Sequence, residues 1–284
     1  MRWQGRRGSR NIEDRRRLGA GRAGGLGLGG VLAVLAIGYV LGIDVTPLLQ
    51  GAGPAGGGGG GAPRELTAAE RQAGEFVAVT LADTEEIWTD IFARDLGASY
   101  RPAVLVLFSD VTASPCGGAS GATGPFYCPL DRKIYLDTAF FATLAERLGA
   151  RGDFAAAYVV AHEVAHHVQN ELGILGEANR LRQQASAARS NAISVRIELQ
   201  ADCLAGIWAR QAEARFGTLE PGDVEEAMNA ARQIGDDTLQ RNAGRRPMPD
   251  SFTHGTSEQR QRWFANGYRT GALGDCDTFG AERL

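Results

Sequence analysis

The sequence predicts a mainly helical α+β domain with a small β-sheet. Residues 101–110 and 132–137 are short, rich in Val, Leu, Ile and Tyr, and bounded by polar residues or Pro, as strands are. After Thr138 the pattern is helical and is interrupted only by Gly and Pro. Two strands are too few for a doubly wound sheet, so an order of helix, strands and then helices favours the α+β class.

The first helix has a recognisable start. Thr67 and Glu70 have the spacing of a capping box, and apolar residues then recur at helical intervals to about Phe92. We therefore expect one or two helices to precede the two strands.

Composition and charge narrow the class of protein. The 284 residues, 44% hydrophobic and 22% charged, are typical of one large globular domain or two modest domains. Residues 1–22 carry eight arginines against Glu13 and Asp14, a balance of +6, so the net charge of −3 leaves −9 for the remainder. An acidic folded part argues against a nucleic-acid partner.

A membrane span is expected near the N-terminus. Residues 23–43 contain no charge, and 21 helical residues are long enough to cross a hydrocarbon core of about 30 Å. Basic residues precede this stretch and Asp44 follows it, so the N-terminus is predicted to be cytoplasmic. Residues 44–63 are Gly-rich and are interpreted as a flexible linker.

These segments predict a domain organisation. It comprises a basic cytoplasmic tail (1–22), a signal anchor in contact with membrane lipid (23–43), a linker (44–63) and a folded domain outside the cytoplasm (64–284). A cleaved secretory signal is the alternative, although the polar N-terminal region is long and no A-x-A cleavage site follows. A twin-arginine export signal around Arg16 and Arg17 lacks the rest of that pattern.

The four cysteines agree with an oxidising compartment, since all follow residue 43. Cys116 and Cys128 bracket a Gly-rich loop, so their pairing is the local choice among three possible pairings. That pairing would leave Cys203 to bond with Cys276. The alternative for Cys203 is a buried free thiol.

A cluster of histidines carries the strongest chemical signal. Asp153 can cap a helix that is apolar almost all round except at His162, Glu163, His166 and His167. His162 and His166 are at i and i+4 and share a helical face, so both can bind one zinc ion. Glu163 completes the H-E-x-x-H pattern, in which the Glu takes a proton from zinc-activated water. Two core histidines satisfied by hydrogen bonds are the alternative.

Two acids on a second apolar helix complete the expected zinc site. Glu198 and Asp202 are at i and i+4 and would face the same way. Glu198 is the candidate third ligand, and Asp202 is expected to accept the free N–H of a ligand histidine, most simply His162. Two solvated acids on an outer helix face are the alternative.

The other two histidines receive different predictions. His254 lies in a loop before a helix that Ser257 is expected to cap, where it could stabilise the oxyanion of a tetrahedral intermediate. An inconsequential loop residue is the alternative. His167 points about 100° away from His166, so a structural role is expected.

The chain resembles a known family. HEVAHHVQ, ELQADCLAGIWA, GPFYCPLDRKIYLD, FTHGTSEQRQRWF and the opening MRWQGRRGSRNIEDRR are similar to the bacterial neutral zinc metallopeptidases, the YpfJ-like membrane proteins. More distantly, HExxH with a downstream ExxxD resembles the gluzincins. The resemblance implies a zincin-type core with an active-site helix under a small sheet. It also implies His162, His166 and Glu198 as zinc ligands, Glu163 as base and Asp202 as a supporting residue.

The combined prediction is a zinc metallopeptidase in the cytoplasmic membrane of a bacterium, acting outside the cytoplasm on a peptide or protein substrate. An edge strand such as residues 132–137 could align the substrate by β-addition. Two alternatives remain: a zinc-stabilised envelope protein that binds peptides or partners without cleaving them, and a zinc hydrolase acting on cell-wall peptide.

Overall fold

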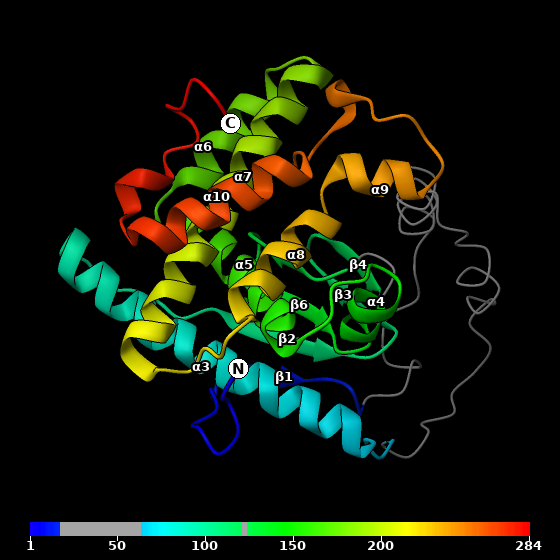
Figure 1. The fold of residues 1–284 in the computed structure, drawn as a ribbon, viewed down its shortest axis with the longest axis vertical. Helices are drawn as coiled ribbons and strands as arrows, with labels where there is room; N and C mark the ends of the chain where they lie inside the picture. Colours follow the sequence, from blue (N-terminus) through cyan, green and yellow to red (C-terminus); the bar gives the residue numbers. More distant parts are fainter. Residues whose placement is uncertain (18–63, 121–123) are drawn as a thin grey trace.

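The computed structural model describes residues 1–17, 64–120 and 124–284. A four-stranded sheet packs one face against helices and the other against a separate hairpin, and most other elements are helices, so the mainly helical α+β class is confirmed (Figure 1). The strands are β1 (Ile12–Asp14), β2 (Val104–Phe108), β3 (Val111–Ser114), β4 (Gly117–Ser120), β5 (Phe126–Cys128) and β6 (Lys133–Asp137). The α-helices are α3 (Ala68–Ile91), α4 (Phe140–Glu146), α5 (Asp153–Glu171), α6 (Ile174–Gln183), α7 (Ala187–Phe216), α8 (Asp223–Gln233), α9 (Asp236–Asn242) and α10 (Ser257–Thr270). Shorter helical turns are η2 (Phe92–Leu96), η3 (Pro249–Ser251) and η4 (Leu273–Cys276).

The main sheet has the order β1-β2-β6-β5. β2 pairs in parallel with both β1 and β6, whereas β5 pairs antiparallel with β6. The two predicted strands correspond to β2 and β6, which are central. The expectation that residues 132–137 form an edge strand is therefore wrong, because β5 occupies that edge.

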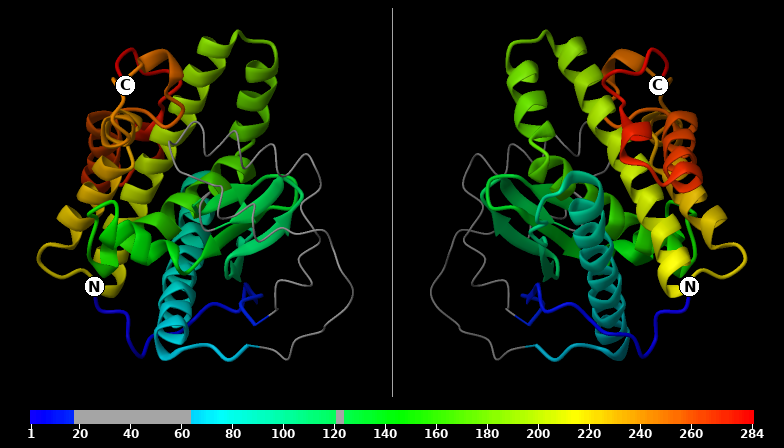
Figure 2. Two further views of the ribbon diagram at one scale, coloured as in Figure 1. Left: turned by 90° about the vertical axis from the view of Figure 1, so that its right-hand side faces the viewer. Right: turned by 90° about the vertical axis from the view of Figure 1, so that its left-hand side faces the viewer.

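Both faces of the central strands are buried, which explains their continuous apolar sequence. Leu105, Leu107, Ile134 and Leu136 belong to the main hydrophobic core with α3, α5 and α7. On the other face, Val106, Phe108 and Tyr135 form a smaller core that includes Ala119 of the β3–β4 hairpin and Cys128. Figure 2 shows the sheet beside α3, with α6 and α7 projecting beyond it as a helical pair.

Helix α5 lies at the centre of the helical part and contacts α3, α6, α7 and α8. Its start differs from the prediction, because Gly152 rather than Asp153 is the N-cap residue. Glu226 of α8 accepts a hydrogen bond from the backbone N–H of Phe154 instead. The last long helix also begins one residue early, since Thr256 is the N-cap and forms a capping box with Gln259.

The first 17 residues pack on the body of the molecule. Strand β1 aligns Ile12 with Leu105 of β2, and the backbone of Ser9 donates to the carbonyl of Ala78 on α3 at 2.8 Å. Trp3 is buried and stacks edge-on against Phe76. The N-terminal residues are therefore part of the fold.

This packing corrects the expected membrane topology. Strands that hydrogen-bond lie about 5 Å apart, so β1 and β2 cannot lie on opposite sides of a bilayer of about 30 Å. Within the described ranges, no helix has both the length and the apolar character that a membrane span requires. The expected span (23–43) and linker (44–63) lie outside the described residues. The expected localisation, in which a membrane separates the N-terminal residues from the domain, is therefore wrong.

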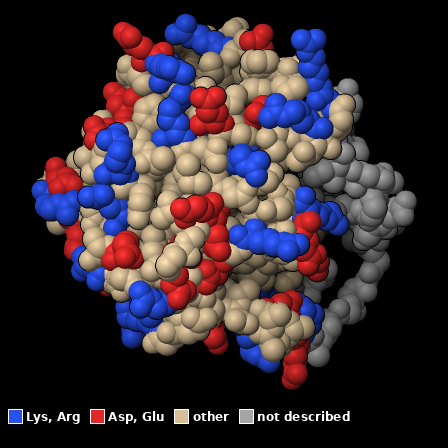
Figure 3. Space-filling view, in the orientation of Figure 1, with Lys and Arg blue, Asp and Glu red and all other residues tan. Residues whose placement is uncertain are grey.

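Both disulfides favoured by the sequence are present. Cys116 bonds with Cys128 beside the smaller core, and Cys203 of α7 bonds with Cys276 of η4. Cys203 is therefore not a free thiol. The face shown in Figure 3 carries acidic and basic side chains interspersed, without a continuous surface of one sign.

Candidate metal centre

Helix α5 presents three side chains of the HExxH segment to one place. His162 and Glu163 are 6% and 7% exposed, and His166 is half-buried. Most neighbours on α5 are Ala and Val, whose packing on all sides buries the helix. Polar groups kept in such surroundings require partners, because burial removes their hydration.

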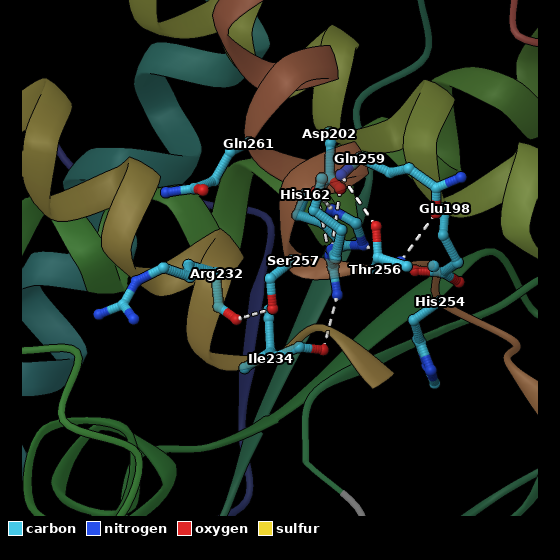
Figure 4. A network of polar contacts seen from close by, with 12 residues as sticks. His162, Glu198, Asp202, Arg232, Ile234, His254, Thr256, Ser257, Gln259 and Gln261 are labelled. Carbon is cyan, nitrogen blue, oxygen red and sulfur yellow. Dashed lines mark hydrogen bonds and ion pairs between the residues drawn. The ribbon is translucent and has the colours of Figure 1, made fainter. Parts of the chain in front are cut away.

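Helix α7 supplies the acids that face α5. One oxygen of Glu198 lies 3.1 Å from Nε2 of His162, and the other lies 3.5 Å from Nε2 of His166. His162, His166 and Glu198 each offer one potential ligand atom, and these three atoms lie within 4.8 Å of one another. Such a grouping is suited to a metal ion. Asp202, one turn further along α7, lies 2.9 Å from Nδ1 of His162. Figure 4 shows His162, Glu198 and Asp202 together, with His254 at the edge of the group.

The electrostatics of the cluster favour ionised acids. Burial opposes ionisation of Glu198, but the neighbouring histidines hold its pKa well below the usual value. Burial also lowers the pKa of His162, yet the carboxylates of Asp202 and Glu198 outweigh it and raise that pKa to about 9. The ionised Glu198 thus lies beside both imidazoles, which is an environment suited to a cation.

Glu163 differs from the other acids. Its Oε2 atom is buried and has no hydrogen-bond partner among the described residues. Burial raises its pKa, and the nearby histidines only partly oppose this effect. A buried carboxylate oxygen without a partner normally calls for an explanation. Together with two imidazoles and a carboxylate, the usual donor set of a catalytic zinc site, it fits a zinc ion that His162, His166 and Glu198 would hold.

A buried arginine that sequence reasoning missed supports Asp202. Arg260 of α10 donates from Nε and Nη2 to the two oxygens of Asp202, at 2.9 and 3.0 Å. Tyr158 of α5 donates to Asp202 at 2.5 Å, and Ile234 accepts from Arg260. Asp202 is fully buried, and burial opposes its ionisation, but Arg260 and His162 lower its pKa. The only sequence signal for Arg260 is its place beside Trp263 and Phe264 on an apolar helix face.

His254 lines the same cavity as the cluster, and Asp236 holds it there. Oδ2 of Asp236 accepts from the backbone N–H groups of Thr253, His254 and Gly255 at 2.7–3.0 Å. Its other oxygen lies 3.2 Å from Nδ1 of His254. The side chain of His254 is 47% exposed, and the carboxylates of Asp236 and Glu198 raise its pKa. Sequence reasoning missed Asp236, whose position directly after Gly235 at the start of α9 is its only signal.

His167 faces away from the cluster, in agreement with its expected structural role. Its Nε2 atom is 2.7 Å from the carbonyl oxygen of Arg101, and its Nδ1 atom is 3.1 Å from the hydroxyl of Tyr127. A neutral ring satisfies both contacts when Nε2 donates and Nδ1 accepts. Burial lowers the pKa of His167, which favours this neutral form.

A cavity of about 1020 Å³ opens onto the cluster. Strand β5 and the start of α4 line one part, through Phe126, Tyr127 and Phe140, whereas Leu175, Asn179 and Arg182 of α6 line another. Its volume is at the upper end of the range for small-ligand sites. The cavity is therefore large enough for several residues of an extended peptide.

Comparisons with known proteins agree with this chemistry. The family model described as "Putative neutral zinc metallopeptidase" matches residues 1–279. The chain is 44% identical to the uncharacterized protein YpfJ of Escherichia coli (strain K12) over 99% of both chains. It is 42% identical to an uncharacterized protein of Mycobacterium bovis, over 73% of this chain and 71% of the relative. No solved structure matches the chain significantly. On the family match and the full-length similarity, the chain belongs to the neutral zinc metallopeptidase family.

Proposed function

We propose that the protein hydrolyses peptide bonds at one zinc ion held by His162, His166 and Glu198. The observation that carries this proposal is the convergence of these three side chains beside the unpartnered buried carboxylate oxygen of Glu163. Zinc at such a site supplies a water of lowered pKa and polarises the carbonyl group of the substrate.

Glu163 acts as the general base and then as the general acid. Its raised pKa, caused chiefly by burial, brings it closer to the range in which a carboxyl group both accepts and returns a proton. It takes a proton from the attacking water and delivers that proton to the amine that leaves.

His254 stabilises the negative charge that develops on the carbonyl oxygen. Because Asp236 holds Nδ1, the ring presents Nε2 as the other polar atom, and the raised pKa favours a form in which that atom donates. A donor that meets the oxyanion of a transition state typically contributes about 3 kcal/mol. Asp236 is a positioning residue in this proposal, because it acts through His254.

The edge strand β5 aligns the substrate. β5 is the edge of the sheet beside the cavity, and Phe126 and Tyr127 line that cavity. An extended peptide can therefore add to the sheet by backbone hydrogen bonds while its side chains enter the cavity.

Zinc analysis and an unbiased peptide library test the proposal. Wild type is expected to contain zinc and to cleave peptides, whereas Glu163→Gln is expected to keep zinc and to lose cleavage by at least about 100-fold, as general acid–base catalysis predicts. Glu177→Gln on the exposed part of α6 is the matched control and should retain both properties.

Two outcomes would contradict the proposal. Equal cleavage by wild type and Glu163→Gln would exclude the role of Glu163. Zinc retention with no cleavage of any peptide or cell-wall peptide would favour a zinc-stabilised binding protein instead.

A further inference from the structure

His166 is oriented by a buried amide. Its Nδ1 atom lies 2.8 Å from Oε1 of Gln169, one turn further along α5. Since an amide oxygen can only accept, Nδ1 carries a proton, so in the neutral ring the lone pair is on Nε2, the atom near Glu198. This is the tautomer in which Nε2 can bind a metal ion.

The side-chain amide of Gln169 cannot rotate by 180° without losing its hydrogen bonds. Its Nε2 atom donates to the backbone carbonyl of Ile197 at 2.8 Å and to Oε1 of Gln200 at 2.9 Å. If the amide were reversed, its oxygen would face two acceptors and its nitrogen would face the N–H of His166. Gln169 is completely buried and Gln200 is 7% exposed, so water cannot readily replace these bonds.

Gln200 continues the connection to the C-terminal segment. Its Nε2 atom donates to the backbone carbonyl of Cys276 at 3.1 Å, while its oxygen accepts from Gln169. Hydrogen bonds therefore run from the ring of His166 through two side-chain amides to the backbone of Cys276. Each amide uses its oxygen on the side nearer His166 and its nitrogen on the far side.

The acceptor at the end of this path is held firmly. Cys276 bonds to Cys203, three residues after Gln200 on α7. Arg196 of α7 donates to the backbone carbonyl of Thr278, and Thr278 Oγ1 donates back to the carbonyl of Arg196 at 2.6 Å. The segment from Cys276 to Thr278 is therefore fixed on α7 at both ends.

We propose that Gln169 and Gln200 form a relay of buried amides that positions His166 for metal binding and couples it to the disulfide-anchored C-terminal segment. The inference rests on the proposed zinc site. The two ligand histidines thus have different neighbours at Nδ1, the ionised Asp202 for His162 and a neutral amide for His166. A neutral acceptor orients the ring without adding another buried negative charge beside Glu163 and Glu198.

Zinc dissociation into a chromophoric chelator tests the positioning role. Gln169→Leu keeps the side-chain size but removes the acceptor, and we expect zinc to leave about 10- to 100-fold faster than from wild type. Gln169→Glu keeps an oxygen for His166 Nδ1–H but loses the donor and adds a buried negative charge, so its rate should be intermediate. Gln183→Leu, the same substitution at the exposed end of α6, should match wild type.

A spectroscopic measurement separates positioning from a general loss of stability. The visible absorption bands of the cobalt-substituted protein report ligand geometry, and we expect them to change in Gln169→Leu and to return toward wild type in Gln169→Glu. If Gln169→Leu matches wild type in dissociation rate and in cobalt spectrum, the relay is refuted while the zinc site stands. If wild type binds no zinc, the proposed function fails first and the relay fails with it.

The coupling to the C-terminal segment is tested by combining variants. Replacing Cys203 and Cys276 with Ser should accelerate zinc loss in wild type but cause no further acceleration in Gln200→Leu, because the relay is already broken there. Arg196→Met loosens the same segment without removing the disulfide, and it takes the place of the Ser pair if that variant does not fold. Fully additive effects would refute the coupling.

Discussion

Helices α7 and α10 cross at two glycines whose replacement gives the sharpest prediction about the fold. A Cβ atom added at Gly267 of α10 would lie 1.8 Å from the carbonyl oxygen of Cys203, and one at Gly206 of α7 would lie 2.1 Å from the carbonyl oxygen of Phe264. Both obstacles are backbone atoms, so no side-chain rotation relieves them. Gly267→Ala therefore forces the two helices apart.

The expected cost follows from this geometry. The distance from Cβ to the oxygen must increase from 1.8 Å to at least 3.0 Å, the shortest separation that real Cβ atoms show. Overpacking of this kind costs up to about 3 kcal/mol, and the better helix propensity of Ala returns about 1 kcal/mol. A net loss of about 2 kcal/mol corresponds to a fall in Tm of about 4–8 °C for a domain of this size.

Calorimetry or circular dichroism with heating measures this loss. Gly176→Ala is the matched control, since it lies within α6 and a Cβ there meets no atom within 4 Å. That variant should gain about 0.5–1 kcal/mol, so the two Gly→Ala changes should shift Tm in opposite directions. An unchanged or raised Tm in Gly267→Ala would refute the close crossing. The variant should also bind zinc more weakly, because separating the helices lengthens the contacts of Arg260 with Asp202.

Two other predictions concern stability at different pH and the docking of the N-terminal segment. Burial raises the pKa of Asp83 to about 6 despite its ion pair with Arg6, so stability that is present below the unfolded pKa of about 4 is lost as the pH rises through 6. Between pH 4 and pH 7, the free energy of unfolding of Asp83→Asn in urea should therefore rise by about 2–3 kcal/mol relative to wild type, whereas that of the exposed Asp90→Asn should not. If the free energies of Asp83→Asn and wild type change in parallel with pH, the prediction is contradicted. A Cβ at Gly8 would lie 3.2 Å from Cβ of Ala78, close to disulfide geometry, so Cys at both positions should crosslink on oxidation and lose free thiols. The pair Gly5→Cys/Ala78→Cys is the control, and equal crosslinking of both pairs would count against the packing.

Local patterns predicted the helices well because their signals lie within a few residues. The capping box of Thr67 and Glu70 is present at the start of α3. The i, i+4 spacing of His162 and His166, and of Glu198 and Asp202, correctly indicated which side chains share a helix face. Local sequence does not show which helix faces contact each other. The contact between α5 and α7 could therefore be predicted only from a family resemblance, or seen in the structure.

Contacts between distant segments account for what was missed. Arg260 reaches Asp202 across 58 residues, and Asp236 reaches His254 across 18. Neither pair has a short-range pattern. The N-cap of α5 was misjudged for a similar reason, because Glu226 of α8 satisfies the start of that helix from another part of the chain. Strand β1 is only three residues long, and its pairing partner β2 lies about 90 residues away.

The arginines near the N-terminus show why a charge count misled the topology. The positive-inside rule concerns basic residues that flank a span and remain beside the bilayer. Arg16 is instead buried, pairs with Asp14 at 2.7 Å and donates to the backbone of Glu70. Arg6 pairs with Asp83 and lies over the ring of Phe216, 4.4 Å from its centre. A sum of charges cannot distinguish these packed arginines from free ones, so the excess of +6 in residues 1–22 includes Arg6 and Arg16 although both have partners in the fold.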